Sequence, residues 1–299
     1  MNATTSTRLH AGIVLASAGR PALLSDLTSR LAHQTVSPVA RVVSVPDEAS
    51  LPPDLDSGWT VVTGTRGLAA QRNAGLAALG PDADVVFFFD DDAIVRRDYL
   101  EQGLAFFAAH PEHVGLTGRV LLDGAASRTY GEVDLAEADR LVAESEHEPL
   151  TGAFRAGRTL FGANFAFRRS AVPDIEFDPR LPLYSWLEDH DFARRLMRHG
   201  PLAQVDDCVI VHRGAASGGR TNHVRLGYSQ LMNPVYLQRA GSFPRWLATW
   251  ELFRPIAKNV AASVGGPQAD WRRERLRGNG LALGDVLRGR ITPERITSL

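Results

Sequence analysis

The chain has 299 residues, of which 44% are hydrophobic and 22% are charged. This composition is ordinary for a globular protein and leaves enough apolar side chains for a sizeable core, so it excludes wholesale disorder. The 33 basic and 34 acidic residues nearly cancel, which excludes an overall positive field and argues against nucleic acid as a partner. Any site for an anion must therefore be local.

The single cysteine, the single lysine and the lack of long apolar runs limit where the protein works and how its arginines are interpreted. Cys208 is the only cysteine, so an internal disulfide is excluded and a reducing compartment, the cytoplasm, is expected. Lys258 is the only lysine, so an arginine in this chain is weak evidence for phosphate recognition. No apolar run approaches the length of a membrane span, and the first apolar stretch is typical of a strand rather than of a signal segment.

The first half of the sequence alternates strand-like and helix-like segments. Apolar runs predict four strands, and apolar residues at helical spacing between and after them predict three helices. The strands are expected over 11–17, 40–45, 59–64 and 84–90, and the helices over 20–35, 69–79 and 97–110. Repeated alternation of this kind predicts an α/β fold with a mostly parallel central sheet and helices on both faces.

The second half is less regular. The stretch 123–157 is polar, acidic and poorly periodic, which predicts an insertion or flap outside the core. Further elements are expected as a strand over 158–170, a short helix over 191–200, a last strand over 208–214 and an amphipathic helix or helix pair over 244–263. We therefore expect a main domain over 8–240, with halves 8–122 and 158–240, followed by a C-terminal helical extension over 241–299.

Three carboxylates follow a strand that should be buried on both faces. The apolar run 85–89 ends directly at Asp90, Asp91 and Asp92, and ligands of open α/β sheets bind at the carboxyl ends of strands. Adjacent carboxylates repel one another unless a cation neutralises them, and oxygen ligands suit Mg²⁺ or Mn²⁺. The triplet predicts a divalent metal site; the alternative is an acidic turn that caps the helix beginning near Arg97.

A second acidic group opens the short helix of the second half. Glu188, Asp189 and Asp191 lie at or before its first turn, where acidic side chains stabilise a helix by capping N–H groups and opposing the dipole. That role alone accounts for them. Together with a distant metal-binding cluster, however, the same residues can supply the general base of a displacement reaction.

The last predicted strand ends at His212, with Arg213 beside it. A histidine in this position is commonly a hydrogen-bonded polar residue, but a strand-end imidazole can also complete a carboxylate metal site. The glycine-rich loop that follows can fold over a diphosphate and bring Arg220 or His223 to it, with Arg213 also assigned to the diphosphate, although an ordinary surface loop is equally consistent with this sequence.

In this order, five segments resemble glycosyltransferase family 2, an inverting family with the GT-A fold. The resemblance runs from about Ala11 to His223. Its motifs are a first nucleotide-binding loop with Ala16, Ser17 and Arg20; a segment with Gly67 and an RNxG motif of Arg72, Asn73 and Gly75; a DxD motif of Asp90 and Asp92; a GxN motif of Gly162 and Asn164; and an ED motif of Glu188 and Asp189. Five motifs in sequence are harder to obtain by chance than any one.

The resemblance implies a nucleotide-diphosphate sugar held by the N-terminal half, with Asp92 on a Mn²⁺ or Mg²⁺ ion and Asp90 and Asp91 beside it. Asp189 would be the catalytic base. After the second strand the chain departs from its relatives, since VSVPDEAS stands where they commonly carry an acidic segment with glycine and serine, and Asp47 is the residue there that would contact the nucleobase or ribose. On the acceptor side it implies Gly162, Asn164 and Asp191, and an acceptor that is a saccharide or lipid-linked saccharide in bacterial surface polysaccharide or glycolipid assembly.

Two other functions fit parts of the sequence. A non-catalytic scaffold subunit that binds nucleotide sugars would keep the fold, but the intact DDD and ED segments argue against it. A nucleotidyltransferase would also use carboxylate-held Mg²⁺, but it would carry a basic, glycine-rich loop after the first strand, and the segment ASAGRP is a poor version of one.

The C-terminal segment has one apolar stripe at helical spacing, with basic residues nearby. Packing on the main domain or on a second subunit, as in a homodimer, is the common role of such a stripe. The alternative is a peripheral position on the inner face of the cell membrane, where tryptophan and basic residues are favoured. The stripe comprises Trp246, Trp250, Phe253, Ile256 and Val260, and the basic residues are Arg245, Arg254 and Lys258.

Overall fold

The computed structural model describes residues 8–64, 66–126, 132–215 and 221–299. Its contacts divide the chain into two compact units. Unit 1 comprises Met1–Arg66, Gln71–Glu176 and Leu196–Ala216, and unit 2 comprises Gly67–Ala70, Phe177–Arg195 and Ser217–Leu299. The domain limits 8–240 and 241–299 stay a prediction.

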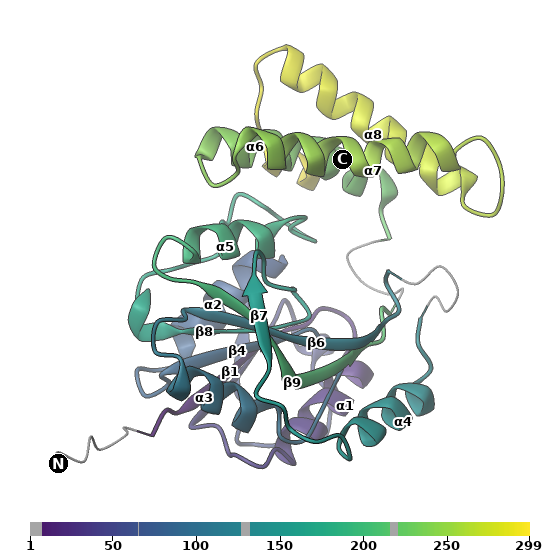
Figure 1. Ribbon diagram of the computed structural model, residues 1–299. Coiled ribbons are helices and arrows are strands. Elements are labelled where there is room, and N and C mark those ends of the chain that lie inside the picture. Colours follow the sequence, from purple (N-terminus) through teal and green to yellow (C-terminus); the bar gives the residue numbers. More distant parts are fainter. Residues whose placement is uncertain (1–7, 65, 127–131, 216–220) are drawn as a thin grey trace. The chain divides into compact units, whose positions relative to one another are not determined.

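Unit 1 is built on a nine-stranded sheet, counted over the described ranges, in the order β3-β2-β1-β4-β8-β6-β9-β5 with β7 on β9 (Figure 1). Strands β1, β2, β3, β4, β6 and β9 share one direction, and β5, β7 and β8 run against them. The sheet is therefore mostly parallel, as predicted. The strands are β1 (Ala11–Ala16), β2 (Ala40–Val45), β3 (Thr60–Thr63), β4 (Val85–Phe89), β5 (Ala93–Val95), β6 (Gly115–Asp123), β7 (Phe154–Gly157), β8 (Asn164–Arg168) and β9 (Leu202–His212).

Helices cover both faces of this sheet because successive strand residues point to opposite sides. Ile13 and Leu15 of β1 belong to the main core cluster with leucines of α1 and α3. On the other face, a Cβ at Gly12 would contact Leu79, and one at Gly75 of α2 would lie 2.3 Å from Val14. The helices are α1 (Pro21–Ala32), α2 (Leu68–Ala78), α3 (Tyr99–Ala109) and α4 (Leu135–Ser145), with short 3₁₀ turns at Glu48–Ser50 and Arg169–Ala171.

The stretch 123–157 differs from the insertion or flap expected of it. Its described part contains α4 and β7, and the α4 residues Ala138 and Val142 are buried in a cluster with Ile94 and Val211. Two buried apolar positions in a helix of 11 residues make too short an apolar pattern to stand out beside many charged residues. Strands β5 and β6 also had no counterpart among the expected elements.

Unit 2 is mainly helical. It contains most of α5 (Glu188–Leu196), together with α6 (His223–Ala240), α7 (Arg245–Ala262), α8 (Ala269–Leu287) and a 3₁₀ turn at Pro293–Ser298. Helices α6 and α8 cross closely, because a Cβ at Gly227 would lie 2.1 Å from the Arg275 carbonyl and one at Gly278 would lie 2.1 Å from the Val224 carbonyl. A helical extension was expected, but helix α6 was not.

Helix α7 exposes most of its predicted apolar stripe. Trp246, Trp250, Phe253 and Val260 are exposed, whereas Ile256 packs against a cluster formed by α6 and α8. No helix in the described ranges combines the length and the apolar character that a membrane span needs.

Candidate active site

Polar residues from four strands of unit 1 meet at one edge of its sheet. Ser17 follows β1, the Asp90–Asp92 triplet follows β4, and Asp123 and His212 are the last residues of β6 and β9. Because these four strands run in the same direction, their carboxyl ends lie at the same edge, where ligands of open α/β sheets bind. The edge collects residues that are up to 195 positions apart in the sequence.

Asp90, Asp92 and His212 form a group that could hold a metal ion, because their ligand atoms all lie within 4.8 Å of one another. His212 Nε2 lies 3.3 Å from Asp92 Oδ1, and both side chains are almost fully buried. The other Asp92 oxygen accepts a hydrogen bond of 2.8 Å from the backbone N–H of Ala215. Two carboxylates and one imidazole suit Mn²⁺ or Mg²⁺, so these residues fit the predicted cation.

Asp123 is the residue of this site that the sequence analysis missed. Its Oδ1 lies 2.7 Å from His212 Nδ1, an arrangement that orients a metal-binding histidine by holding its other ring nitrogen. In the sequence, Asp123 is the first residue of the acidic stretch 123–157, and no sequence feature distinguishes it from the other acidic residues there. Only the pairing of β6 with β9, in which Asp123 lies opposite His212, brings the two together.

The protonation of His212 depends on the charges of the carboxylates beside it. Burial opposes the charge on His212, but hydrogen bonds to Asp123 and Asp92 prevail and raise its pKa to about 10. Burial would also raise the pKa of Asp92, yet the same histidine and the Arg20 guanidinium lower it to about 2. Without a metal, a proton on His212 therefore balances the carboxylates, and a cation bound there would take its place.

The middle carboxylate of the triplet has a different role. Asp91 accepts a hydrogen bond of 2.5 Å from the Ser17 hydroxyl, and its Oδ2 accepts another of 3.0 Å from Arg20 Nε. Arg20 Nη2 also lies 2.5 Å from Asp91 Oδ1. Asp91 thus ties the loop after β1 to the end of β4, and it is not part of the group that could hold a metal.

Arg72 holds the first carboxylate of the triplet from α2. It is buried, and its Nη2 donates to Asp90 Oδ1 at 3.0 Å and to the Gly162 carbonyl at 2.8 Å. The guanidinium also lies over the rings of Phe88 and Phe165. Arg72 is therefore a residue that positions Asp90, and Gly162 takes part through its carbonyl oxygen.

The remaining predicted donor-side and acceptor-side residues of unit 1 lie in different settings. Ala16 is half-buried at the end of β1, and Asn73 is half-buried on α2. Asp47 follows β2, is exposed and accepts a hydrogen bond of 2.7 Å from the Ser50 hydroxyl. Asn164 is fully buried in β8, and its side-chain oxygen accepts from the Thr117 hydroxyl at 3.1 Å.

The two arginines assigned to a diphosphate loop are not equivalent. The Arg213 guanidinium donates to the Val133 carbonyl at 3.1 Å and contacts Glu132 at 3.2 Å. Arg220 lies outside the described residues. The Arg213 guanidinium is therefore engaged by residues 132–133, while its backbone N–H donates to the backbone carbonyl oxygen of Asp92 at 3.1 Å.

The ED motif lies in unit 2 at the start of α5. Glu188 is its first residue and is buried; Asp191, also buried, pairs with Arg195 at 2.8 Å. Asp189 is half-buried between them, and its Oδ1 accepts from the backbone N–H of His190 at 2.8 Å. As predicted, all three acidic residues occupy the first turn of a helix.

The chain that leads into α5 is strained. Leu183, Ser185 and Leu187 have φ values of 60°, 53° and 73°, a left-handed conformation that side chains of this size rarely adopt. Gly67 bridges to Leu183, and the Ala69 N–H donates to the Ser185 hydroxyl, which holds this conformation in place. Such strain persists only where the surroundings enforce it, and it gathers at functional sites.

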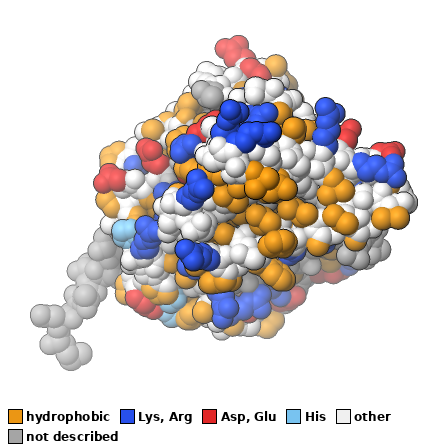
Figure 2. All heavy atoms as spheres, turned by 90° about the horizontal axis from the view of Figure 1, so that it is seen from above, with side chains coloured by type: hydrophobic (Ala, Val, Ile, Leu, Met, Phe, Trp, Pro, Cys, Tyr) orange, Lys and Arg blue, Asp and Glu red, His pale blue; other side chains and the backbone are white. Residues whose placement is uncertain are grey.

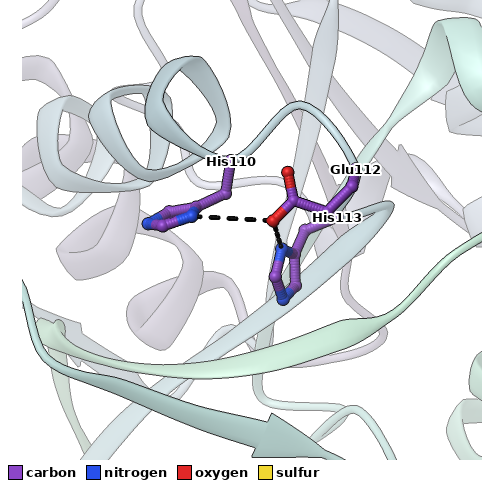
Figure 3. Close-up of side chains that lie close together, drawn as sticks. All are labelled: His110, Glu112 and His113. Atoms are coloured by element: carbon purple, nitrogen blue, oxygen red, sulfur yellow. Dashed lines mark hydrogen bonds and ion pairs between the residues drawn. The ribbon is translucent and has the colours of Figure 1, made fainter.

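A second group of possible ligands joins α3 to β6. His110 Nδ1 and His113 Nδ1 lie 3.7 Å and 3.0 Å from the same Glu112 oxygen (Figure 3). Both rings also contact Phe154, with centroids 4.6 Å and 5.4 Å away. This group is at the start of β6, the opposite edge of the sheet from the Asp90–Asp92 triplet, and aromatic packing accounts for the position of both rings.

Comparisons with known proteins agree with the motifs. Residues 85–223 match the model described as glycosyl transferase family group 2. A mannosyltransferase from Pyrobaculum calidifontis, solved with GDP-Man and Mn²⁺, aligns with a TM-score of 0.54 and 16% identity over 93% of this chain and 88% of that one. No curated protein matches the chain.

Residues 1-349 of S. aureus TarS align with a TM-score of 0.55 and 14% identity over 97% of this chain and 83% of that one. The same fragment in complex with UDP-GlcNAc aligns with a TM-score of 0.53 and 16% identity over 97% and 84%. At such identities these likenesses establish the fold. Residues 85–223 are therefore similar to glycosyl transferase family group 2, and the chain is a glycosyltransferase with the GT-A fold.

Proposed function

We propose that the chain is a metal-dependent inverting glycosyltransferase that moves a sugar from a nucleotide diphosphate to a hydroxyl acceptor. The observation that carries this proposal is the convergence of Asp90, Asp92 and His212 within 4.8 Å at the carboxyl edge of the sheet. A similar fold binds GDP-Man and Mn²⁺, which supports the same type of donor here. Asp90, Asp92 and His212 would hold the divalent cation.

Each protein group at this edge has a distinct task in the proposed reaction. When bound, a divalent cation would neutralise the negative charge that develops on the nucleotide diphosphate as it leaves. Asp123 keeps His212 Nε2 directed at Asp92, and Arg72 holds Asp90 in place. Ser17 and Arg20 fix Asp91 and so shape the loop proposed to receive the nucleotide.

Asp189 is the proposed catalytic base. It would take the proton from the acceptor hydroxyl as that oxygen attacks the anomeric carbon, while the bond to the donor phosphate oxygen breaks and its electron pair leaves with the nucleotide diphosphate. One displacement from the opposite side inverts the anomeric configuration. The strained segment before α5 supports this role, because it holds Glu188 and Asp189 at the start of the helix at a cost in backbone energy.

For the acceptor and the location, the proposal follows the family resemblance. The acceptor is a saccharide or lipid-linked saccharide of bacterial surface polysaccharide or glycolipid assembly, and the protein works in the cytoplasm at the inner face of the membrane. The catalytic domain would span 8–240, with the extension 241–299 outside it.

Thermal unfolding with nucleoside diphosphates tests the metal and the donor class together, because a ligand that binds only the folded state raises the unfolding temperature. We expect stabilisation by one nucleoside diphosphate in Mn²⁺ and none in excess chelator, and Asp92→Ala should abolish it. Glu112→Gln is the matched control, since it removes a carboxylate from the other group that could hold a metal.

The nucleobase of the stabilising nucleoside diphosphate narrows the set of candidate sugar donors. Release of the free nucleoside diphosphate from the matching sugar nucleotide then reports turnover. Equal stabilisation in chelator and in Mn²⁺ would contradict the metal assignment. Pyrophosphate as the product from a nucleoside triphosphate would instead identify a nucleotidyltransferase.

A further inference from the structure

Helix α7 turns its largest apolar side chains to solvent. In an α-helix with 3.6 residues per turn, positions 246, 250, 253 and 260 fall within an arc of about 80°, so the exposed side chains form one continuous stripe. The exposed fractions are 67% for Trp246, 59% for Trp250, 63% for Phe253 and 52% for Val260, and Val264 after the helix is 84% exposed. An exposed patch of this kind marks a binding surface.

The opposite face of α7, which packs inside unit 2, is mixed: small and polar side chains are buried there, and Leu252 and Ile256 pack beside them against an apolar cluster of α6 and α8. Ala248, Glu251 and Asn259 are buried there, and Asn259 Nδ2 donates to Gln230 Oε1 at 2.8 Å. A water-facing helix normally buries its apolar stripe and exposes its polar one. Helix α7 instead exposes its largest apolar side chains while it buries Glu251 and Asn259, which indicates that its outer face meets a medium other than water.

Basic side chains flank the stripe. Arg254 and Lys258 lie about 80° and 120° to one side of Trp246 around the helix, and Arg245 lies about 100° to the other side. All three are exposed, and their long apolar stems allow the charged ends to reach past an apolar surface. In the face shown in Figure 2, Lys and Arg side chains border a broad hydrophobic area.

The charge of the C-terminal segment differs from that of the whole chain. Residues 245–299 contain 10 Arg or Lys and 5 Asp or Glu, a net charge of +5, whereas the whole chain has a net charge of −1. An anionic partner is complementary to this segment. A second copy of the chain would instead bring two cationic flanks against each other, since the same patch meets itself in a twofold dimer.

We propose that the outer face of α7 is a docking surface for an anionic lipid bilayer, on which the helix lies in the plane of the interface. Tryptophan is favoured at the boundary between headgroups and acyl chains, and basic side chains bind the lipid phosphates. This inference rests on the helix alone and holds whichever donor the site takes.

Flotation with lipid vesicles in chelator, without a sugar nucleotide, tests this surface separately from the proposed enzyme activity. We expect the full-length protein to float with vesicles of phosphatidylcholine and phosphatidylglycerol and to float much less with phosphatidylcholine alone. Trp246→Ser with Trp250→Ser should lower the bound fraction by about tenfold or more, because two large apolar side chains no longer enter the bilayer. Both are exposed, so the fold should be retained, and the unfolding temperature checks this.

Two further variants sharpen the result. Val39→Ser with Leu150→Ser removes two exposed apolar side chains from unit 1 and should leave flotation unchanged. Arg245→Gln with Lys258→Gln should reduce binding to phosphatidylglycerol vesicles, as should high salt. Absence of flotation by the intact protein, or equal flotation of the tryptophan variant, would overturn the proposal. If the intact protein does not float and light scattering shows a dimer that the tryptophan variant does not form, the face would be assigned to a second copy of the chain instead.

Discussion

His212 and Asp123, the last residues of two neighbouring parallel strands, are joined by a contact of 2.7 Å between Nδ1 and Oδ1. The contact leaves the other ring nitrogen, Nε2, 3.3 Å from Asp92. A carboxylate that holds a histidine in this way keeps it protonated when no metal is present and directs it toward the metal position when one binds. Both consequences are measurable.

The first prediction concerns the proton that a metal ion must displace. Because the pKa of His212 is raised to about 10, Mn²⁺ binding at about pH 8 should release close to one proton. Asp123→Asn removes a hydrogen bond that raises this pKa, so the variant should release a smaller fraction. Calorimetry in buffers with different ionisation enthalpies measures the number of protons. Equal release by both proteins would exclude Asp123 as the group that keeps His212 charged.

The second prediction concerns stability without metal. The pKa of His212 is raised from its ordinary value of 6.5 to about 10, so its stabilising charge is fully present below pH 6.5 and is lost as the pH rises through about 10. In chelator, the free energy of unfolding should therefore fall over this window by more in the wild-type protein than in His212→Gln.

Denaturant unfolding of the two proteins across that window measures the difference. Comparison with the variant removes the contributions of other groups, such as Asp91, whose pKa burial raises to about 7. Parallel stability curves for the two proteins would contradict the assignment of a charged His212.

The third prediction separates binding from chemistry at α5. Asp189→Asn should keep the fold and the affinity for the nucleotide diphosphate while lowering turnover by about 10²-fold or more, the usual size of a general-base contribution. Calorimetry gives the affinity and single-turnover kinetics give the rate. Turnover near the wild-type rate would transfer the role to Glu188 or Asp191, or remove the base from this helix.

The fourth prediction tests the crossing of α6 and α8. A Cβ at Gly278 would lie 2.1 Å from the Val224 carbonyl oxygen, so Gly278→Ala forces the two backbones apart and should destabilise the protein by roughly 1–3 kcal/mol. Gly280→Ala on the same helix is the matched control, because a Cβ there meets nothing within 4 Å. The control should be as stable as the wild type or more so, since alanine is the better helix former. Equal loss in both variants would contradict a close crossing.

Local pattern was sufficient for much of the fold and for part of the site. The apolar run of β4 and the alternation of strands and helices predicted a parallel sheet, because side-chain periodicity follows directly from strand and helix geometry. The Asp90–Asp92 triplet and the ED motif at the start of α5 were visible for the same reason, since each is contiguous in the sequence. The helical character of 244–263 also followed from spacing alone.

The tertiary structure decided what depends on pairing between distant segments. The contact of Asp123 with His212 requires β6 to lie beside β9, a pairing that neither segment encodes by itself. Likewise, Asp91 differs in role from Asp90 and Asp92 because Arg20 and Ser17 approach it in the folded protein. The apolar stripe of α7 could be predicted from the sequence, but the buried side of the helix could not. The buried side depends on the polar partners that α6 and α8 provide for Asn259.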